Sequence, residues 1–498
     1  MRIQGEKMKS ALDMLMQNLN QIGAEVTSCN YNDFTCDFTL KHRQLSTKDF
    51  PNLEQGLPDY SVILSISGLA EGGQRIHMKH FATEAEKTHF LQQLKDIEGV
   101  DHRVIGPNLG YFRIDQDVAL GMIIWLQKGT YLIEKIKSFL RKIMMDNGYI
   151  EVATPALANL DLWRQSGHWD MYRQNMCCVQ AGEKEDAYAL KPMNCPLHVS
   201  IFKSLQISYK NLPYKISEFG QVTRYEPSGS LHGLFRARCF TQDDAHVFCT
   251  EDQITSVIEN FIRMLRKVYR AFNFDNIELV LATRPEVFIG AEEAWDKAES
   301  DLKTAANRCE LDPIISAGDG AFYGPKLEFR VKDKRGRVWT CGTVQLDFEL
   351  PKRLGARYIN SGGNEEVPVM IHHAILGSIE RFVGILLENT EGKMPFWLSP
   401  TQVAIIPVHP KYTEYAKTIS KLIQSHNISN KIDETNETLN FKVRKWWDEE
   451  YVPVTCILGE KEMENQTVSL RINGIKVENM LTLDEFVEKL KDMGTLVE

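Results

Sequence analysis

Residues Lys215 to Cys249 combine the side chains needed to hold a nucleotide beside a second ligand. The stretch reads as two strands joined by a loop rich in Pro, Gly and Ser. Because successive side chains point to opposite faces of a strand, one face of the second strand is predicted to carry Arg236, Arg238, Phe240, Gln242, Asp244 and His246. Arginine suits phosphate oxygens, a ring suits a base, and Asp with His suits a second ligand or a metal. An ordinary solvated sheet face is the alternative.

Other reactive residue types stand alone in the sequence. Cys195 lies beside Pro196 in a turn-like segment, where a small buried residue is the alternative to a metal ligand. Ser378 and Arg381 are predicted to share one face of an apolar helix, and His372 lies just before that helix. An arginine among so many apolar neighbours is costly to bury unless it meets an anion, with a snorkelling side chain as the alternative.

The elements that would position these residues follow from hydrophobic periodicity. A long amphipathic helix is predicted from Thr130 to Asn147, and a strand from Tyr149 to Ala153. Further helices are predicted over residues 8–21, 84–97, 252–272, 291–308 and 411–426, and further strands over 34–40, 277–283, 327–332, 338–350, 452–458 and 467–472. Beyond a boundary at residues 395–400, strands alternate with helices, which indicates a small α/β domain with a partly parallel sheet.

Composition limits the class of protein. The 498 residues suggest about three domains, and no apolar run reaches the roughly 18 residues that span a bilayer. The ten cysteines include no Cys-x-x-Cys pair, a pattern typical of reduced thiols and not of a disulfide framework. With a net charge of −9, RNA binding would have to depend on local basic patches or on unpaired bases. We find no secretory signal, and we therefore expect a cytoplasmic protein without membrane contact, an organellar location being the alternative.

Five segments together resemble the catalytic core of the threonyl-tRNA synthetase family: KPMNCP, RYEPSGSLHGLFRARCFTQDDAH, GAFYGPKLEF, CGTVQLDF and MIHHAILGSIERF. The resemblance implies an α+β fold with a six- or seven-stranded antiparallel class II sheet flanked by helices. It implies a class II catalytic domain with a zinc site over residues 101–399 and an α/β anticodon-binding domain over 400–498. A small α+β region of uncertain role would occupy residues 1–100. The helix from Thr130 would contribute to a homodimer interface.

The resemblance also implies an activity. ATP would activate L-threonine to threonyl-adenylate, and the threonyl group would pass to the 3′ end of tRNA(Thr), with Mg²⁺ accompanying ATP. The catalytic residues would be Arg224, Lys326 and Arg381, which stabilise charge on the phosphates and position the reactants. ATP-binding residues would be Arg224, Glu226, Arg236, Phe240, Gln345 and Arg381.

The resemblance further implies one zinc ion per subunit, held by Cys195, His246 and His372. Three protein ligands leave coordination positions open for a substrate. The pocket for L-threonine would consist of Met193, Tyr172, Gln242, Asp244, Tyr323 and Ser378. Such a site demands a hydroxyl and would reject valine, whereas serine lacks only a methyl group and would be rejected less well.

Two departures from the family pattern concern fidelity and tRNA contacts. Residues 1–100 contain no His-x-x-x-His editing element, and His77 and His80 are three apart. We therefore expect no editing in cis. A separate trans-editing factor would then have to remove serine from mischarged tRNA(Thr). The anticodon contacts would come from Asn436, Arg444, Glu462 and Arg471, although the family's basic residue near Tyr451 is missing. Thr340 also stands where the family often has Gln.

Two other functions stay open at this level. The chain could activate threonine and load it onto a carrier, or it could act as a regulatory RNA-binding protein that keeps the fold. Loss of Arg224, Arg381 or a zinc ligand would favour the regulatory protein, and all of these residues are present.

Overall fold

The structure is a computed structural model that describes residues 13–19, 25–30, 35–39, 53, 57, 61–68, 74–80, 83–88, 100–181, 184–321 and 323–495. The chain divides into two compact units, residues 1–101 and 102–498. In the first unit, β1 (Glu25–Asn30), β2 (Thr35–Thr39), β3 (Ser61–Gly68) and β4 (Gln74–His80) form an antiparallel sheet in the order β1-β2-β4-β3.

Parts of three predictions fall in this first unit. Helical residues 13–19 and 84–88 lie inside the helices predicted over 8–21 and 84–97, whose remaining residues are outside the described part of the chain. Strand β2 confirms the strand predicted over 34–40. His77 and His80 lie on β4, and their side chains are outside the described residues.

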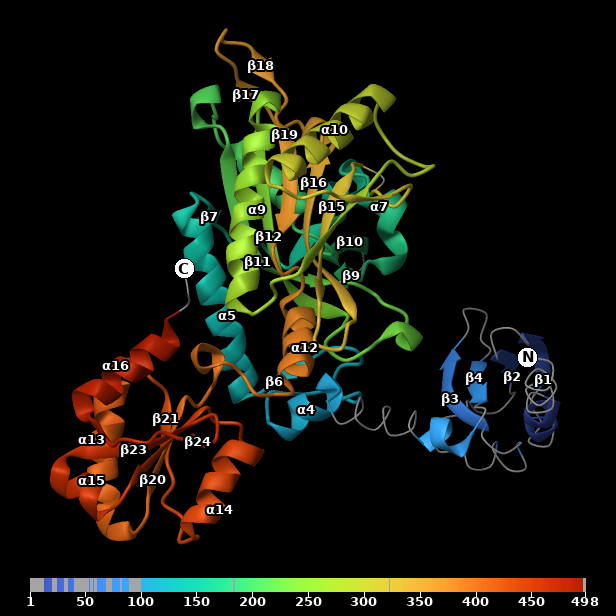
Figure 1. The fold of residues 1–498 in the computed structure, drawn as a ribbon. Helices are drawn as coiled ribbons and strands as arrows, with labels where there is room; N and C mark the ends of the chain where they lie inside the picture. Colours follow the sequence, from blue (N-terminus) through green and yellow to red (C-terminus); the bar gives the residue numbers. More distant parts are fainter. Residues whose placement is uncertain are drawn as a thin grey trace. The chain divides into compact units, whose positions relative to one another are not determined.

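An eight-stranded sheet forms the centre of the second unit (Figure 1). Its order is β14 (Ile314–Ser316), β13 (Ile277–Ala282), β15 (Lys326–Lys332), β16 (Val338–Asp347), β19 (Val369–Ala374), β12 (Cys239–Cys249), β11 (Tyr214–Thr223) and β7 (Ile150–Glu151). All neighbours pair antiparallel except the short edge strands β14 and β7, which pair parallel. The fold class is α+β as predicted, with more strands than the expected six or seven because of these edges.

Long helices cover the sheet. Helix α9 (Ile254–Ala271) lies along one face and packs with α10 (Glu292–Arg308), as Figure 1 shows. Helix α5 (Gln127–Asp146) begins three residues before its predicted start and buries the expected apolar stripe, including Leu132, Ile136 and Leu140. It ends where Gly148 adopts a left-handed φ of 79°, which a glycine does without steric cost.

The two faces of the sheet have different tasks, as the adjacent His372 and His373 on β19 illustrate. His373 points to the α9 side, where its ring lies 4.6 Å from that of Phe261 and its Nε2 is 2.7 Å from the hydroxyl of Tyr149. His372 points to the opposite side, toward Asp347 and His246. Alternation along the strand therefore separates a packed core face from a polar face.

The strand predicted over 149–153 is shorter, Ile150–Glu151, and two further boundary differences bear on the candidate site. The expectation that Arg236 and Arg238 lie on the second strand of the 215–249 hairpin is wrong, because β12 begins at Cys239. The backbone N–H of Arg238 donates to Gly121 O and not to a neighbouring strand. Strand β16 stops at Asp347, whose carboxylate accepts the N–H groups of Glu349 and Leu350 and so begins α11 (Leu350–Leu354).

The C-terminal part of the second unit has its own sheet and core. Strands β21 (Asn430–Ile432), β20 (Val403–Pro407) and β22 (Val454–Leu458) pair parallel, and β23 (Thr467–Ile472) pairs antiparallel to β22. This confirms the predicted partly parallel sheet. Helices α13 (Thr413–Gln424) and α16 (Leu483–Gly494) supply Ile419, Ile423, Phe486 and Leu490 to one buried cluster with the sheet.

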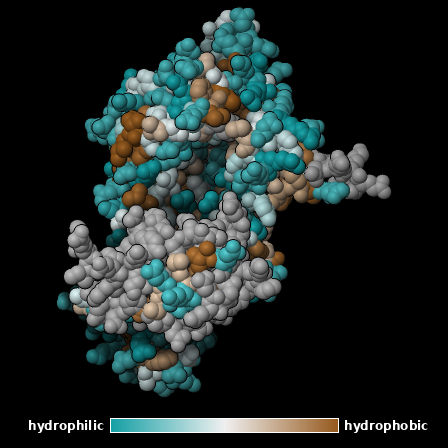
Figure 2. Space-filling model, turned by 90° about the vertical axis from the view of Figure 1, so that its right-hand side faces the viewer, coloured by the Kyte–Doolittle hydropathy of each residue, from teal (hydrophilic) through white to brown (hydrophobic). Residues whose placement is uncertain are grey.

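Hydrophobic residues on the face drawn in Figure 2 form small separate groups among hydrophilic ones. In the part of the chain that the structure describes, no helix has the length and apolar character needed to cross a membrane.

Candidate functional site

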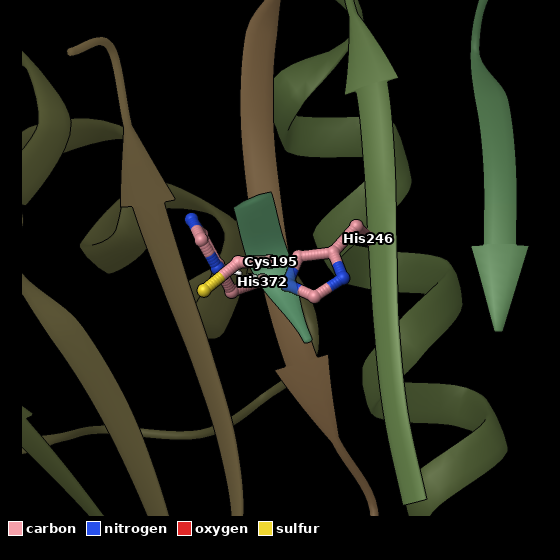
Figure 3. A group of neighbouring side chains, drawn as sticks. All are labelled: Cys195, His246 and His372. Atoms are coloured by element: carbon pink, nitrogen blue, oxygen red, sulfur yellow. Dashed lines mark hydrogen bonds between the residues drawn. The ribbon is translucent and has the colours of Figure 1, made fainter. Parts of the chain in front are cut away.

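Three buried side chains meet on the polar face of the central sheet. Cys195 begins α8 (Cys195–Ser204), His246 lies on β12 and His372 on β19, and Figure 3 shows the three side chains directed toward one another. Strands β12 and β19 pair with His246 directly opposite His372. One ligand atom from each residue lies within 4.8 Å of the others. Ligands at about 2.0–2.3 Å from a zinc ion would be spaced on this scale.

Outer partners fix the tautomers of both histidines. Glu218 on β11 accepts from His198 Nε2 (2.9 Å), so the other ring nitrogen of a neutral His198 accepts from His246 Nδ1 (2.7 Å). On the other side, Asp347 accepts from His372 Nε2 (3.0 Å). These contacts leave lone pairs on His246 Nε2 and His372 Nδ1, which face each other at 3.0 Å. Two facing lone pairs repel unless a cation lies between them, and the donor set therefore fits a metal.

Charges around the cluster support this assignment. Burial alone would raise the pKa of Glu218, but hydrogen bonds from His198, Thr154 and Lys191 outweigh it and lower the pKa to about 2. Glu218 is thus ionised and can only accept. Burial lowers the pKa of His246 well below its usual value and raises that of Cys195 well above its own. A neutral imidazole is ready to bind a metal, whereas the thiol must first lose its proton.

A cavity of about 680 Å³ adjoins this cluster along β12. Its wall includes eight of the residues predicted to act on the substrates: Arg224, Glu226, Arg236, Phe240, Gln242, Lys326, Ser378 and Arg381. Thr340 also lines it. Although Arg236 lies outside the strand, the loop returns its side chain to the cavity, where Glu226 Oε2 accepts from Arg236 Nε at 3.1 Å. Arg238 instead packs over the Tyr225 ring and donates to Glu226 O.

Two of the cavity arginines, Arg224 and Arg381, are held in position by neighbouring rings and backbone groups. The guanidinium of Arg224 lies 5.2 Å from the Phe240 ring and 5.7 Å from the Tyr172 ring, and its Nε donates to Pro192 O. Arg381 lies in the first turn of α12 (Ile379–Thr390), where its N–H donates to the Ser378 side chain. Arg381 Nε is buried and has no hydrogen-bond partner among the described residues. An unpaired buried guanidinium nitrogen suits an anionic ligand.

The residues predicted to hold the amino acid lie around the cluster and the near end of the cavity. Asp244 accepts from Asn194 Nδ2 at 2.9 Å and lies 3.8 Å from His246 Nε2. Tyr323 lies 5.6 Å from the His372 ring and donates to Gln345 at 3.0 Å. Gln242 forms a backbone bridge to Ser378, and Met193 packs beside Cys195.

A buried carboxylate ties β12 to the start of α12. Asp243, which faces away from Asp244, accepts from the N–H groups of Ile375 and Leu376. Burial raises the pKa of Asp243 to about 7. This contact fixes the turn that carries Gly377 and Ser378 against the strand that carries His246, and it therefore sets the relation between the cavity and the cluster.

The four predicted anticodon contacts are distributed over a loop, two helices and a strand of the C-terminal part: Asn436 lies in the loop before α14 (Leu439–Arg444), which Arg444 ends. Asn436 is exposed, and Arg444 is exposed beside Glu449. Glu462 accepts from Gly459 N and Ser469 Oγ at the start of α15 (Glu460–Asn465). Arg471 lies on β23, where its Nε is buried and lacks a hydrogen-bond partner among the described residues. Asn436 and Arg444 are thus the two that present open polar groups.

The predicted site residues did not include five residues that surround and orient the cluster: His168, Lys191, His198, Glu218 and Asp347. His198 follows Cys195 by three residues on α8, a spacing that could have revealed it. His168 lies 3.9 Å from Cys195 Sγ, and burial lowers its pKa to about 4. Glu218 and Asp347 carry no local signal, because their partners lie on other strands and helices.

Two regions of the chain match known protein families, and the sequence resembles those of curated proteins. Residues 178–390 match the family described as tRNA synthetase class II core domain (G, H, P, S and T), and residues 402–493 match the anticodon binding domain family. The chain is 46% identical over 417 residues to the threonine–tRNA ligase of Ehrlichia canis (strain Jake), covering 84% of this chain and 65% of that one. It is 44% identical over 417 residues to the threonine–tRNA ligase of Phenylobacterium zucineum (strain HLK1), covering 84% and 63%.

The chain thus spans slightly less than two thirds of the length of these curated relatives. A crystal structure of the RNA binding domain of threonyl-tRNA synthetase from Cryptosporidium parvum Iowa II resembles it with a TM-score of 0.76 and 38% identity. That similarity covers 80% of this chain and 99% of the other.

Proposed function

Because this chain belongs to the threonyl-tRNA synthetase family, we propose that it activates L-threonine with ATP and transfers the threonyl group to tRNA(Thr). One observation carries the proposal: a single strand, β12, serves both the arginine-lined cavity and the Cys195–His246–His372 cluster. Phe240 and Gln242 face the cavity, and His246 belongs to the cluster. The reactants of an adenylation would thus lie next to each other.

In this reaction the threonine carboxylate attacks the α-phosphate of ATP, and pyrophosphate leaves. Arg224 would contact the α-phosphate, and Arg236 and Arg381 would hold the γ-phosphate together with Mg²⁺. Lys326 would approach the reacting carboxylate. These cations offset the negative charge that builds on the phosphates in the transition state, so catalysis needs no nucleophilic side chain. The unpaired Nε of Arg381 supports an anionic ligand at that position.

We assign Cys195, His246 and His372 to one zinc ion per subunit, which the two facing lone pairs and the buried thiol fit. Bound there, zinc would act as a Lewis acid toward the amino and hydroxyl groups of threonine. Asp244, beside the cluster, would accept a hydrogen bond from the threonine hydroxyl group. Tyr172, Met193, Tyr323, Gln242 and Ser378 would enclose the remaining atoms. Valine offers no hydroxyl and would leave these polar groups unpaired, which gives strong discrimination.

The remaining parts of the proposal concern assembly and tRNA. We propose a catalytic domain over residues 101–399 and an anticodon-binding domain over 400–498, with contacts from Asn436, Arg444, Glu462 and Arg471. Two such chains would form a homodimer in the cytoplasm. We further propose that serine is not edited in cis and that a separate factor clears seryl-tRNA(Thr).

Threonine-dependent ATP–pyrophosphate exchange tests the activation step. We expect exchange with threonine, exchange roughly 10–200-fold weaker with serine, and exchange weaker by about 10⁴-fold or more with valine. A zinc chelator should abolish exchange, and added Zn²⁺ should restore it. Equal exchange with valine, or indifference to chelation, would contradict the zinc assignment. Charging of tRNA(Thr) in the same preparation separates a ligase from an enzyme that loads a carrier and from a regulatory protein.

A further inference from the structure

His102 is a fully buried histidine outside the site described above. It begins α4 (His102–Asn108), which packs against α12, and none of its side chain is exposed. Its Nε2 lies 3.0 Å from the backbone nitrogen of Leu234. Because a backbone N–H can only donate, His102 Nε2 accepts, and the ring proton of the neutral side chain is on Nδ1. That Nδ1 donates to Glu388 Oε1 at 2.7 Å.

Glu388 anchors the imidazole in the molecule. Its Oε1 also accepts from the backbone nitrogen of His102 at 3.0 Å, and its Oε2 pairs with Arg337 at 2.6 Å. Arg337 is held in turn by Asp333 at 2.7 Å. Burial alone would raise the pKa of Glu388, but the hydrogen bonds from His102 and Arg337 outweigh it and lower the pKa. The acceptor is therefore a fixed carboxylate on α12.

The residue that His102 holds belongs to the loop between β11 and β12. Leu234 is buried, and both Leu234 and Phe235 line the cavity together with Arg236. The loop passes so close to the imidazole that a Cβ on Gly233 would lie 2.4 Å from His102 Nε2. Gly233 also has a left-handed φ of 53°. Position 233 of the loop therefore has no space for a side chain next to the His102 ring.

Ring contacts continue from His102 into the cavity. The ring of Phe235 lies 4.1 Å from His102 and 4.5 Å from Trp339. Trp339 is in turn 5.8 Å from the guanidinium of Arg381. On the opposite side, the absence of a side chain at Gly384 of α12 lets Phe235 and Leu234 approach the helix. The loop residues that contact His102, Leu234 and Phe235, therefore line the same cavity as Arg236 and Arg381.

We propose that His102 is a positioning residue, which holds the loop of residues 227–238 so that Arg236 and Phe235 are preorganised over the ATP cavity. This inference rests on the proposed use of that cavity for ATP. His102 would act through the loop without touching the nucleotide. Preorganisation lowers the cost of ordering the loop on binding, and its loss weakens binding of the ligand that the loop covers.

Two substitutions separate the two nitrogens of the ring. In His102→Asn, the side-chain amide can still donate to Glu388, but the acceptor for Leu234 is lost. In His102→Gln, the longer side chain can bring its oxygen to the position of Nε2 and accept from Leu234, while the donor to Glu388 is lost. We expect His102→Asn to raise the KM for ATP about tenfold in pyrophosphate exchange, with the KM for threonine within about twofold of wild type. His102→Gln should restore most of the ATP affinity.

Thermal stability should rank these two variants in the opposite order. His102→Asn keeps the hydrogen bond to the buried carboxylate, which is the stronger of the two, and should melt at a higher temperature than His102→Gln. A purely structural role would make KM follow stability. The inference is overturned if the KM for ATP follows the melting temperature across the two variants, or if His102→Asn leaves that KM unchanged.

The loop offers a second test in which His102 itself is unchanged. Gly233→Ala would drive a methyl group into His102 Nε2, and we expect it to raise the KM for ATP at least about fivefold. Gly229→Ala is the matched control, because a Cβ at Gly229 of the same loop meets no atom within 4 Å and requires no left-handed backbone. Equal KM values for the two alanine variants would contradict the proposal.

Direct ATP binding by calorimetry keeps this inference separate from the proposed function. If the wild-type chain binds ATP but shows no threonine-dependent exchange, the proposed activity fails. The positioning role would still be supported if wild type and His102→Gln bind ATP with lower Kd values than His102→Asn does. Tyr149→Phe removes a buried hydrogen bond to His373 elsewhere in this unit and should leave the Kd unchanged.

Discussion

Single residues in this protein owe their roles to partners that lie far away in the chain. The neutral tautomers of His246 and His372 present lone pairs to each other only because Glu218, through His198, and Asp347 determine which ring nitrogen carries the proton. The adjacent His373 has an ordinary packing role on the other face. Residue type alone therefore does not distinguish a ligand from a core histidine; the outer hydrogen-bond partner does.

Glu380 provides a prediction at this scale. It lies in the first turn of α12, 4% exposed, and accepts from Thr241 N and the Ser378 hydroxyl. Burial raises its pKa from 4.5 to about 6. Since the folded-state pKa is raised, the stabilising effect of protonation is fully present below pH 4.5 and is lost as the pH rises through about 6.

Glu380→Gln keeps the acceptor oxygen and removes the charge. We expect the variant to unfold with a free energy about 2 kcal/mol higher than wild type at pH 8. The difference should shrink toward zero as the pH falls to 4.5. Urea unfolding from pH 4.5 to 8 measures it. A variant that is less stable at pH 8, or a difference that does not vary with pH, would contradict the prediction.

At the scale of elements, the sheet order determines the site. Strand β19 lies between β16 and β12, and it brings His372 opposite both Gln345 and His246. Helix α9 supports the other face of these strands. Tyr269 of α9 accepts from Gly342 N and donates to Ile375 O, which joins the helix to β16 and to the turn before α12. The close approach of helix and strand depends on a glycine at position 342.

Gly342→Ala tests this packing. The added Cβ would lie 2.4 Å from a Leu265 methyl carbon, 2.8 Å from the Tyr269 hydroxyl and 3.1 Å from Ile375 O, so the helix or strand must shift. We expect a loss of about 1–3 kcal/mol in the free energy of unfolding. Gly362→Ala is the control, because its nearest atoms lie at 3.4 Å or more in side chains of an exposed hairpin. Equal free energies of unfolding for the two variants would contradict the prediction, because they would show that a side chain fits between α9 and β16 at position 342.

At the scale of the whole molecule, family membership and the two matched regions support a catalytic part joined to a part that reads the anticodon. The proposed zinc site requires a hydroxyl group on the amino acid, which both threonine and serine have. These two differ by one methyl group only, so the site discriminates weakly between them. A separate hydrolytic activity is then required for accuracy, and the sequence shows no His-x-x-x-His element in residues 1–100. On this proposal, the catalytic site cannot by itself supply the discrimination between threonine and serine that accurate charging requires.

Mischarging by the purified chain measures this property. We expect seryl-tRNA(Thr) to accumulate when serine replaces threonine, and preformed seryl-tRNA(Thr) to persist with a half-life close to that without protein. Addition of a serine-specific deacylase should remove the product. Rapid deacylation by the chain alone would contradict the proposed absence of editing in cis.

Local sequence was enough to predict the long helices α5, α9, α10 and α13, six strands of the central sheet and one face of β12, but it did not predict β19. The period-two pattern correctly grouped Phe240, Gln242, Asp244 and His246, because alternation is a property of the extended backbone itself. It failed for Arg238, where a loop contact with Gly121 replaces strand pairing. The resemblance to a family supplied the set of candidate site residues, and the structure brings the catalytic, ATP, threonine and zinc candidates to one sheet face.

Tertiary structure alone decided which isolated residues meet. Cys195, His246 and His372 come from a helix and two strands, and only the order β16-β19-β12 brings them together. His102 is separated from Leu234 by 132 residues and from Glu388 by 286, and nothing in its neighbourhood in the chain indicates either contact. Patterns along a sequence report local geometry, whereas contacts between distant elements depend on how the sheet and its helices pack.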